Sequence, residues 1–157
     1  MKIKLWSVGK LHENYIKAGV EDFTKRMNKY FIAEWELIAP PKNAGVLPEA
    51  ELKKQEAKQI LGKLQQDDYL ILLDERGKQI SSIQLAEMLQ QKANESVRTL
   101  VFLIGGAFGV DDSVRQRADF IWSLSKLTFP HILVRLMLAE QLYRACTILK
   151  NEKYHHG

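Results

Sequence analysis

The segment from Trp122 to His131 combines residue types that suit ligand binding. It reads Trp-Ser-Leu-Ser-Lys-Leu-Thr-Phe-Pro-His, so small hydroxyl side chains alternate with apolar ones directly after an apolar run. A loop of this composition can offer backbone N–H and C=O groups to the edge of a purine, while Leu127 and Phe129 hold the ring between them. The composition therefore favours binding of a heteroaromatic ligand.

A glycine loop precedes this segment in the chain. Residues 105–109 read Gly-Gly-Ala-Phe-Gly and follow the apolar run 100–104. Three of the five residues lack a side chain, so a ligand could approach the backbone closely, although a tight strand-to-helix turn also needs glycine. The spacing is not GxGxxG, and no Gly-Lys-Ser/Thr follows. These differences argue against a dinucleotide or P-loop site and predict a ligand without a large phosphate load.

Four side chains could move protons or stabilise charge near such a ligand. His131 lies next to the candidate loop, but a packed or capping histidine would look the same. Arg144 follows Glu140 by four residues, so the two could simply form an ion pair on one helix. Tyr154 and His155 lie close to the end of the chain, where a disordered terminus is the ordinary alternative. From the residues alone, both interpretations stay open for all four.

The elements that must position these residues alternate between strand and helix. Short apolar runs predict strands, and apolar residues at helical spacing predict helices. We expect strands at 3–8, 33–38, 69–73, 100–104 and 120–124, with helices at 12–29, 48–64, 82–91, behind Asp111, and 134–149. This alternation predicts an α/β fold, a mostly parallel sheet with helices on both faces, in one domain spanning residues 1–157.

The predicted topology brings three loops to one place. In open parallel sheets, ligands bind outside the carboxyl ends of the strands. The loops after Leu73, Ile104 and Leu124 all leave strands at that edge. We also expect a simple turn at 74–77 and a helix capped by Ser82.

Composition narrows the functional class. The 157 residues include 46% hydrophobic and 27% charged residues, as in ordinary globular proteins, and no apolar run is long enough to cross a membrane. The N-terminus lacks the features of a secretory signal and Cys146 is the only cysteine, so we expect a cytoplasmic protein without disulfides. A net charge of +4 is compatible with a polyanionic partner, although a solvated basic helix would also explain the lysine-rich first thirty residues.

The last predicted helix has few polar residues. Between Leu133 and Leu149 they are Arg135, Glu140, Gln141, Arg144 and Thr147. The surplus apolar surface predicts contact with a second copy of the chain, and a helix deeply buried within one chain is the alternative. Cys146, within this helix, is expected to be inert packing.

Taken together and in order, the motifs resemble the ribosomal RNA large subunit methyltransferase H family of the SPOUT superfamily. The resemblance rests on motifs spread along the whole chain: Val8-Gly9-Lys10, Leu73-Asp74-x-x-Gly77-Lys78, Leu103-Ile104-Gly105-Gly106-x-x-Gly109, the segment from Trp122 to His131, Leu142-Tyr143-Arg144-Ala145, and Tyr154-His155. This sequence departs from the pattern by ending His155-His156-Gly157, which leaves open which imidazole acts.

The resemblance implies a trefoil knot near the C-terminus and a homodimer. It implies S-adenosylmethionine as cofactor, with S-adenosylhomocysteine as product and no metal. The implied cofactor contacts are Leu73, Gly105, Leu124, Ser125, Lys126, Leu127, Thr128 and Phe129. The implied reaction methylates N3 of a pseudouridine in 23S ribosomal RNA within the assembled ribosome, with Arg144, Tyr154, His155 and, less directly, His131 as candidate catalytic residues. Neither DNA nor a membrane is an expected partner.

Two other functions are compatible with parts of the sequence. A non-catalytic ribosome-binding or assembly factor could keep this fold after losing the chemistry, although the intact Gly105 loop argues against that. A nucleotide-binding Rossmann enzyme is disfavoured because the phosphate-binding motifs are missing.

Overall fold

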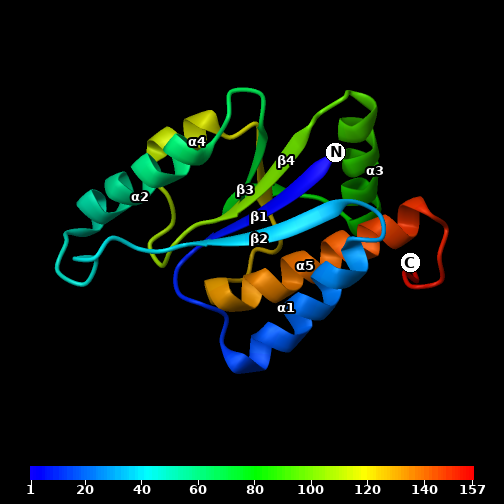
Figure 1. Cartoon of the computed structure of the whole chain (residues 1–157), viewed down its shortest axis with the longest axis horizontal. Helices are drawn as coiled ribbons and strands as arrows, with labels where there is room; N and C mark the ends of the chain where they lie inside the picture. The colour runs from blue at the N-terminus through cyan, green and yellow to red at the C-terminus, as the bar shows by residue number, and fades with distance from the viewer.

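A computed structural model describes all residues from Met1 to Gly157. Strands and helices alternate along the chain, as the sequence predicts (Figure 1). The elements are β1 (Lys2–Val8), α1 (Asn14–Met27), β2 (Ile32–Ile38), α2 (Glu49–Lys63), β3 (Tyr69–Gln79), α3 (Ser82–Asn94), β4 (Thr99–Ile104), α4 (Asp112–Arg117), β5 (Phe120–Ser123) and α5 (His131–Leu149).

The five strands form one sheet in the order β2-β1-β4-β3-β5, and every neighbouring pair is parallel. All the carboxyl ends therefore lie at the same edge of the sheet. The predicted parallel sheet is confirmed. The strand order was not predicted, because apolar periodicity does not report which strands are neighbours.

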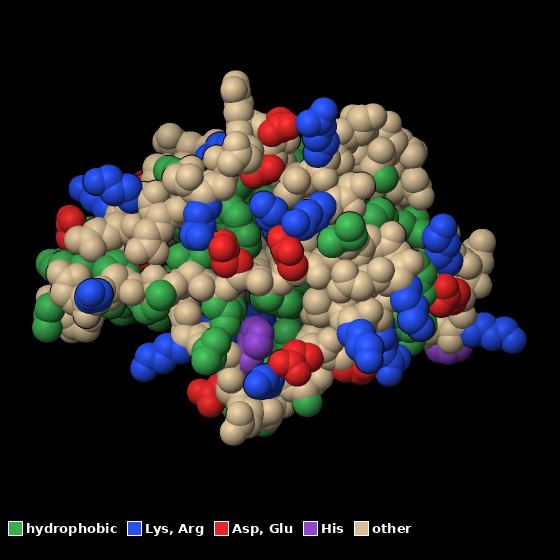
Figure 2. Space-filling model, viewed as in Figure 1, with side chains coloured by type: hydrophobic (Ala, Val, Ile, Leu, Met, Phe, Trp, Pro, Cys, Tyr) green, Lys and Arg blue, Asp and Glu red, His purple; other side chains and the backbone are tan.

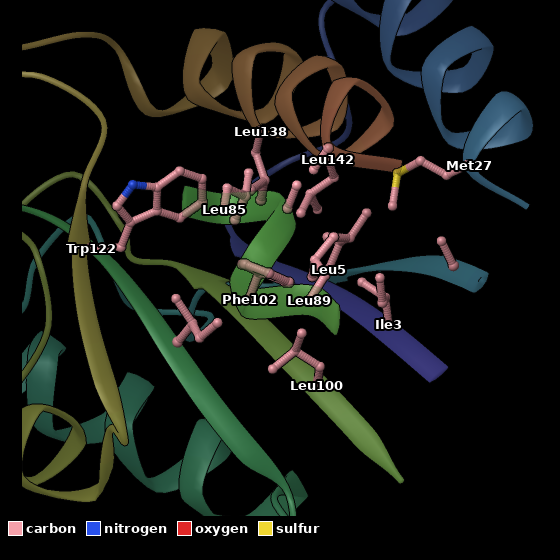
Figure 3. Close-up of a cluster of buried hydrophobic side chains, with 14 of the residues drawn as sticks. Ile3, Leu5, Met27, Leu85, Leu89, Leu100, Phe102, Trp122, Leu138 and Leu142 are labelled. Atoms are coloured by element: carbon pink, nitrogen blue, oxygen red, sulfur yellow. The ribbon is translucent and has the colours of Figure 1, made fainter. Parts of the chain in front are cut away.

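Helices cover both faces of the sheet, as predicted (Figure 1). The side chains of β4 alternate between the two faces: Leu100, Phe102 and Ile104 belong to one buried cluster, and Val101 and Leu103 to the other. The first cluster also contains residues of α1, α3 and α5 (Figure 3), while the second contains residues of α2 and α4. Because β4 is buried on both sides, its sequence is continuously apolar.

Helix α5 lies between α1 and α3 on the first face (Figure 1). Leu138, Leu142 and Ala145 are fully buried, and Leu136 packs against Gly19 of α1. Contacts within one chain therefore explain the largely apolar character of this helix. This agrees with the alternative that the helix is buried within one chain. The helix is no longer an independent reason to expect a dimer. Buried Cys146, whose pKa burial raises to about 12, is unreactive packing as expected.

Residues 74–77 are not the simple turn that was predicted. Strand β3 continues through them to Gln79, and its pairing with β5 shifts between Leu73 and Lys78. A Cβ at Gly77 would lie 2.6 Å from the backbone oxygen of Ile121. Glycine is needed here because the two backbones approach closely, so a residue that suggested a turn in fact permits a bulged strand.

Two helix starts also differ from the prediction. Ser81, and not Ser82, caps α3 through a capping box with Gln84. Helix α5 begins at His131, three residues earlier than expected, immediately after Pro130. Asp111 caps α4 as predicted, accepting a hydrogen bond from the backbone N–H of Ser113.

Three of the basic side chains in the N-terminal region are paired with acidic ones. Lys2, Lys17 and Arg26 each pair with a nearby carboxylate. Figure 2 shows Lys and Arg side chains spread over the visible face and mixed with acidic ones. The solvated-face explanation fits these pairs. None of the helices combines the length and hydropathy that crossing a bilayer would require.

Candidate functional site

A cavity of about 530 Å³ opens at the carboxyl edge of the sheet. This volume is within the range of small-molecule sites. The loops after β3, β4 and β5 and the first turn of α5 form its wall, so the three predicted loops do meet. Its lining includes Leu73, Asp74, Glu75, Gly105, Gly106, Phe108, Arg115, Leu124, Ser125, Leu127, Thr128, Phe129, His131 and Val134.

The glycine loop keeps one side of the cavity open. A Cβ at Gly105 would lie 2.8 Å from Cγ1 of Val110, too close for any side chain without rearrangement. Gly109 has a φ of +82°, which favours glycine, and its N–H donates to the oxygen of Gly106 at 3.1 Å. The loop thus turns tightly, and Gly105 lines the cavity at a position where a side chain would collide with Val110.

The loop after β5 is held in shape by its own hydroxyl groups. Ser123 Oγ donates to the oxygen of Ser125 at 2.8 Å, and Ser125 Oγ accepts from the N–H of Leu127 at 3.0 Å. Thr128 Oγ1 donates to Glu75 Oε2 at 2.8 Å and so ties this loop to the bulge of β3. A ligand would therefore meet a largely pre-formed wall.

The cavity wall also carries charge. Asp74 forms an ion pair with Arg115 and accepts a hydrogen bond from the backbone N–H of Arg76 at 2.8 Å. Burial alone would raise the pKa of Asp74, but these donors lower it below its usual value. Asp74 is therefore ionised at neutral pH, with Glu75 close by. Arg76 and Arg115 also line this wall, so the two carboxylates do not give it a net negative charge.

The structure brings together seven of the eight predicted cofactor contacts. Lys126 is the exception, because it does not line the cavity. Gly105, which adds no side chain to the cavity, and the apolar side chains of Leu127 and Phe129 fit an adenosyl compound. Sequence reasoning missed Asp74, because its segment suggested only a turn.

His131, the first residue of α5, lies one turn before a buried arginine that sequence reasoning passed over. Arg135 is fully buried one turn further along the helix. Its Nε donates to Ser7 Oγ at 2.8 Å and its Nη1 to the oxygen of Lys10 at 2.9 Å. Its Nη2 is buried without a hydrogen-bond partner. The available signal was a lone arginine, four residues after a histidine, in an apolar helix.

The other predicted catalytic residues gather at the far end of α5. Arg144 donates to Glu140 from Nε at 2.9 Å and from Nη2 at 2.6 Å, and its Nη1 lies 3.2 Å from Nδ1 of His155. The Arg144 guanidinium also stacks over the ring of Tyr154, whose hydroxyl donates to Glu140 at 3.1 Å. The predicted Glu140–Arg144 pair exists, and the tail folds onto it.

Within one chain this cluster does not reach the cavity. Arg144 is thirteen residues from His131 on a continuous helix, which is about 20 Å at 1.5 Å per residue. His131 is therefore the only one of the four predicted catalytic residues that lines the cavity. No group of three His, Cys, Asp or Glu side chains is arranged to hold a metal ion.

Sequence comparisons match the chain over almost its whole length. A family model described as "Predicted SPOUT methyltransferase" matches residues 1–155. Proteins named ribosomal RNA large subunit methyltransferase H from Cytophaga hutchinsonii and Flavobacterium psychrophilum are 47% and 46% identical over 156 residues. That alignment covers 99% of this chain, and 100% and 99% of theirs. The Enterococcus faecalis protein of the same name is 42% identical over 160 residues, covering 99% of each chain.

Two solved structures share the fold at low sequence identity. A probable methyltransferase from Bordetella pertussis has a TM-score of 0.55 and 12% identity, covering 92% of this chain and 96% of its own. A probable methylase family protein from Haemophilus influenzae has a TM-score of 0.53 and 12% identity, covering 99% and 70%. At this identity the similarity concerns the fold.

Proposed function

Because the chain belongs to the SPOUT methyltransferase family, we propose that it methylates N3 of a pseudouridine in 23S ribosomal RNA, using S-adenosylmethionine. Full-length identity of 47% to a ribosomal RNA large subunit methyltransferase supports methyl transfer to large-subunit RNA. The position of the acceptor atom comes from the resemblance in the motifs. The assembled ribosome as substrate would place the reaction in the cytoplasm.

One observation carries the proposal. Seven residues expected to contact the cofactor, from three separate segments, line one cavity of about 530 Å³. Leu127 and Phe129 would hold the adenine ring, and the bare backbone at Gly105 would lie against the cofactor. Asp74 and Glu75 would lie near its positive charge, together with Arg76 and Arg115 of the same wall. Lys126 stays a predicted contact, which its backbone could make from the same loop.

The cofactor supplies a methyl group already activated by its sulfonium. The chain mainly has to align donor and acceptor, and orientation of this kind supplies at most about 7–11 kcal/mol of the barrier. N3 of the acceptor also carries a proton at neutral pH. Groups that stabilise negative charge developing on the base therefore accelerate the transfer.

We propose that the active unit is a homodimer. The cluster of Arg144, Tyr154 and His155 lies about 20 Å from the cavity of its own chain, so a partner's tail would have to bring these residues to the acceptor base. Exposed apolar side chains such as Leu11, Tyr15 and Phe108 offer surface for such contact. A trefoil knot formed by the loops around the cavity is part of the same proposal and rests on family membership.

Mass spectrometry of 23S ribosomal RNA tests the proposed substrate. A strain lacking the gene should lose one methyl group from a pseudouridine, and purified protein with S-adenosylmethionine should restore it on isolated ribosomes. An unchanged methylation pattern would refute the assignment. Ribosome binding without any methyl transfer would instead favour the non-catalytic assembly factor.

Calorimetry tests the proposed cofactor, and small-angle scattering tests the proposed homodimer. S-adenosylmethionine should bind to the purified protein at sub-millimolar concentration. Small-angle scattering at the same concentration should give the mass of two chains, about twice 18.1 kDa. Single chains in an active preparation would rule out the shared site.

A further inference from the structure

The space beside Gly9 is the point where two nitrogen atoms of α5 converge. A Cβ at Gly9 would lie 3.1 Å from Arg135 Nη2 and 3.3 Å from His131 Nε2. Gly9 has a φ of +138°, so the chain follows a path there that ordinary residues rarely adopt. Both nitrogens therefore border the space that a side chain at Gly9 would fill.

Arg135 brings a positive charge to this place without a carboxylate to balance it. Its hydrogen bonds go to the Ser7 hydroxyl, the Lys10 carbonyl and Nδ1 of His12 at 3.3 Å, all neutral groups. Its Nη2 has no partner, and the whole side chain is buried. A buried, unbalanced cation is costly for the fold, which suggests that it serves the site next to it.

The imidazole of His131 has two distinct edges. Nε2 and Cδ2 face Gly9, at 3.3 and 3.8 Å from the position of the missing Cβ, so Nδ1 belongs to the opposite edge of the ring. The residue also lines the cavity proposed for the cofactor. No hydrogen bond within the chain involves this ring, so Nδ1 is free for a ligand.

Arg135 Nη2 makes no hydrogen bond to this ring, but the guanidinium charge near the Nε2 edge disfavours an N–H there. The lone pair of the neutral imidazole is then favoured on Nε2 and the proton on Nδ1, since the partner of one ring nitrogen sets the state of the other. Burial and then the charge of Arg135 lower the pKa of His131, which keeps the ring neutral at physiological pH. Across the cavity the charged groups are Asp74, Glu75, Arg76 and Arg115, and His12 lies on the far side of Arg135.

The first turn of α5 also favours negative charge on a ligand beside His131. Pro130 provides no side-chain cap, and the first turn contains no acidic residue. The unpaired N–H groups of a long helix carry partial positive charge at this end. Negative charge on a ligand beside His131 would therefore be stabilised by the helix as well as by the ring.

We infer that His131 donates a hydrogen bond from Nδ1 to a carbonyl oxygen of the acceptor base, and that Arg135 is the positioning residue that fixes this tautomer. The inference rests on the proposed function. When the N3 proton leaves to solvent, negative charge spreads onto the carbonyl oxygens flanking N3, and the donor stabilises it. His131 is then an electrophile and not the proton acceptor, and it forms no bond to the base.

Nuclear magnetic resonance reads the tautomer directly. The chain has four histidines, so two-bond ¹H–¹⁵N spectra of labelled protein at pH 7.5 are simple, and the signal missing in His131→Asn assigns the ring. We expect a neutral ring protonated on Nδ1. A proton on Nε2, or an imidazolium, overturns the inference. Arg135→Met should lose the Nδ1–H preference, and the wild-type spectrum decides even where that variant does not fold.

Matched substitutions at His131 separate a donor from a base. The amide nitrogen of asparagine occupies nearly the place of Nδ1, whereas that of glutamine lies nearer Nε2. With saturating cofactor on unmethylated ribosomes, His131→Ala and His131→Gln should react about 100-fold more slowly. His131→Asn should stay within about tenfold of wild type, because it keeps the donor.

The outcomes are distinguishable from failure of the proposed function. Equal loss in His131→Asn and His131→Ala means that the ring accepts a proton, and overturns the inference while the methyltransferase stands. Full activity in His131→Ala overturns it as well. A wild-type protein that transfers no methyl group to ribosomes overturns the proposed function and, with it, the inference.

Discussion

The two ends of helix α5 differ in whether their polar groups have hydrogen-bond partners. At its carboxyl end, Glu140 accepts hydrogen bonds from Gln141, Arg144 and Tyr154, and the tail closes over them. At its amino end, Arg135 keeps a buried N–H without a partner, one turn after His131, which lines the cavity. The chain satisfies its own polar groups where it holds its tail. It leaves this one unsatisfied next to the cavity where we propose that a ligand binds.

The largest effect should come from closing the cavity. Gly105→Arg should weaken S-adenosylmethionine binding at least about 100-fold, because even its Cβ would lie 2.8 Å from Val110 Cγ1. Calorimetry measures this directly. Gly62→Arg on α2 is the matched control, since nothing lies within 4 Å of a Cβ there, and it should bind as wild type. Equal affinity in both variants would mean that the cofactor lies elsewhere.

Changes at the tail should act on rate and not on cofactor binding. Arg144→Ala and His155→Ala should lower the single-turnover rate about 100-fold while cofactor affinity changes less than about threefold, since both lie about 20 Å from the cavity of their own chain. Arg144→Lys keeps the charge without the paired hydrogen bonds, and its rate should lie between those of Arg144→Ala and wild type. If these variants lost cofactor affinity as strongly as rate, the tail would lie at the cofactor. That result would contradict the division of roles between the two ends of α5.

A smaller effect should follow from loosening the wall of the cavity. Thr128→Val removes the hydrogen bond to Glu75 and should weaken cofactor binding about threefold to tenfold, because the loop after β5 then loses its tie to the bulge of β3. Thr128→Ser keeps the hydroxyl and is the control. If both variants bind like wild type, the tie is not part of the pre-formed wall.

The smallest effect concerns how the tail is attached. Tyr30 donates to both carboxylate oxygens of Glu152 at 2.7 Å, and burial followed by this carboxylate raises the pKa of Tyr30 to about 12. An ordinary tyrosine ionises near pH 10. The fold therefore gains stability from neutral Tyr30 below pH 10 and loses it as the pH rises toward 12.

Tyr30→Phe should cost less than about 1 kcal/mol at neutral pH, because the contact is exposed. Its denaturant stability should also fall less steeply than that of wild type between pH 10 and 12. The thiol of Cys146 titrates in the same window in both proteins, so the difference reports the titration of Tyr30 together with its coupling to that thiol. Identical slopes would show that Glu152 does not hold Tyr30 in the folded protein.

The sequence predicted the elements of the fold well and their boundaries less well. Strands such as 100–104 are continuously apolar because both faces of the sheet are covered, and the sequence alone shows that pattern. The sequence did not predict that β3 continues through residues 74–77, because Asp, Arg and Gly are as common in turns as in a bulge. The order of the strands depends on packing between distant segments.

The sequence likewise predicted some residues of the site and missed others. The residues predicted to contact the cofactor come from ordered motifs, and the shared edge of parallel strands explains why seven of the eight line one cavity. Arg135 was missed because an arginine in a helix suggests a surface residue, and only the fold shows it fully buried against Ser7 and Lys10. The separation of Arg144 from His131 follows from helix length, which the sequence already contained.

The packing of α5 against α1 has a consequence for how the protein is made. These helices are far apart in the sequence, and they cover the same face of the sheet. During translation at about 5–20 residues per second, α1 waits for its partner until α5 has been synthesised. This part of the core can therefore close only after α5 has left the ribosome. A chain stopped before α5 would expose the apolar surface of β1, β4 and α1 and become a target for chaperones and proteases.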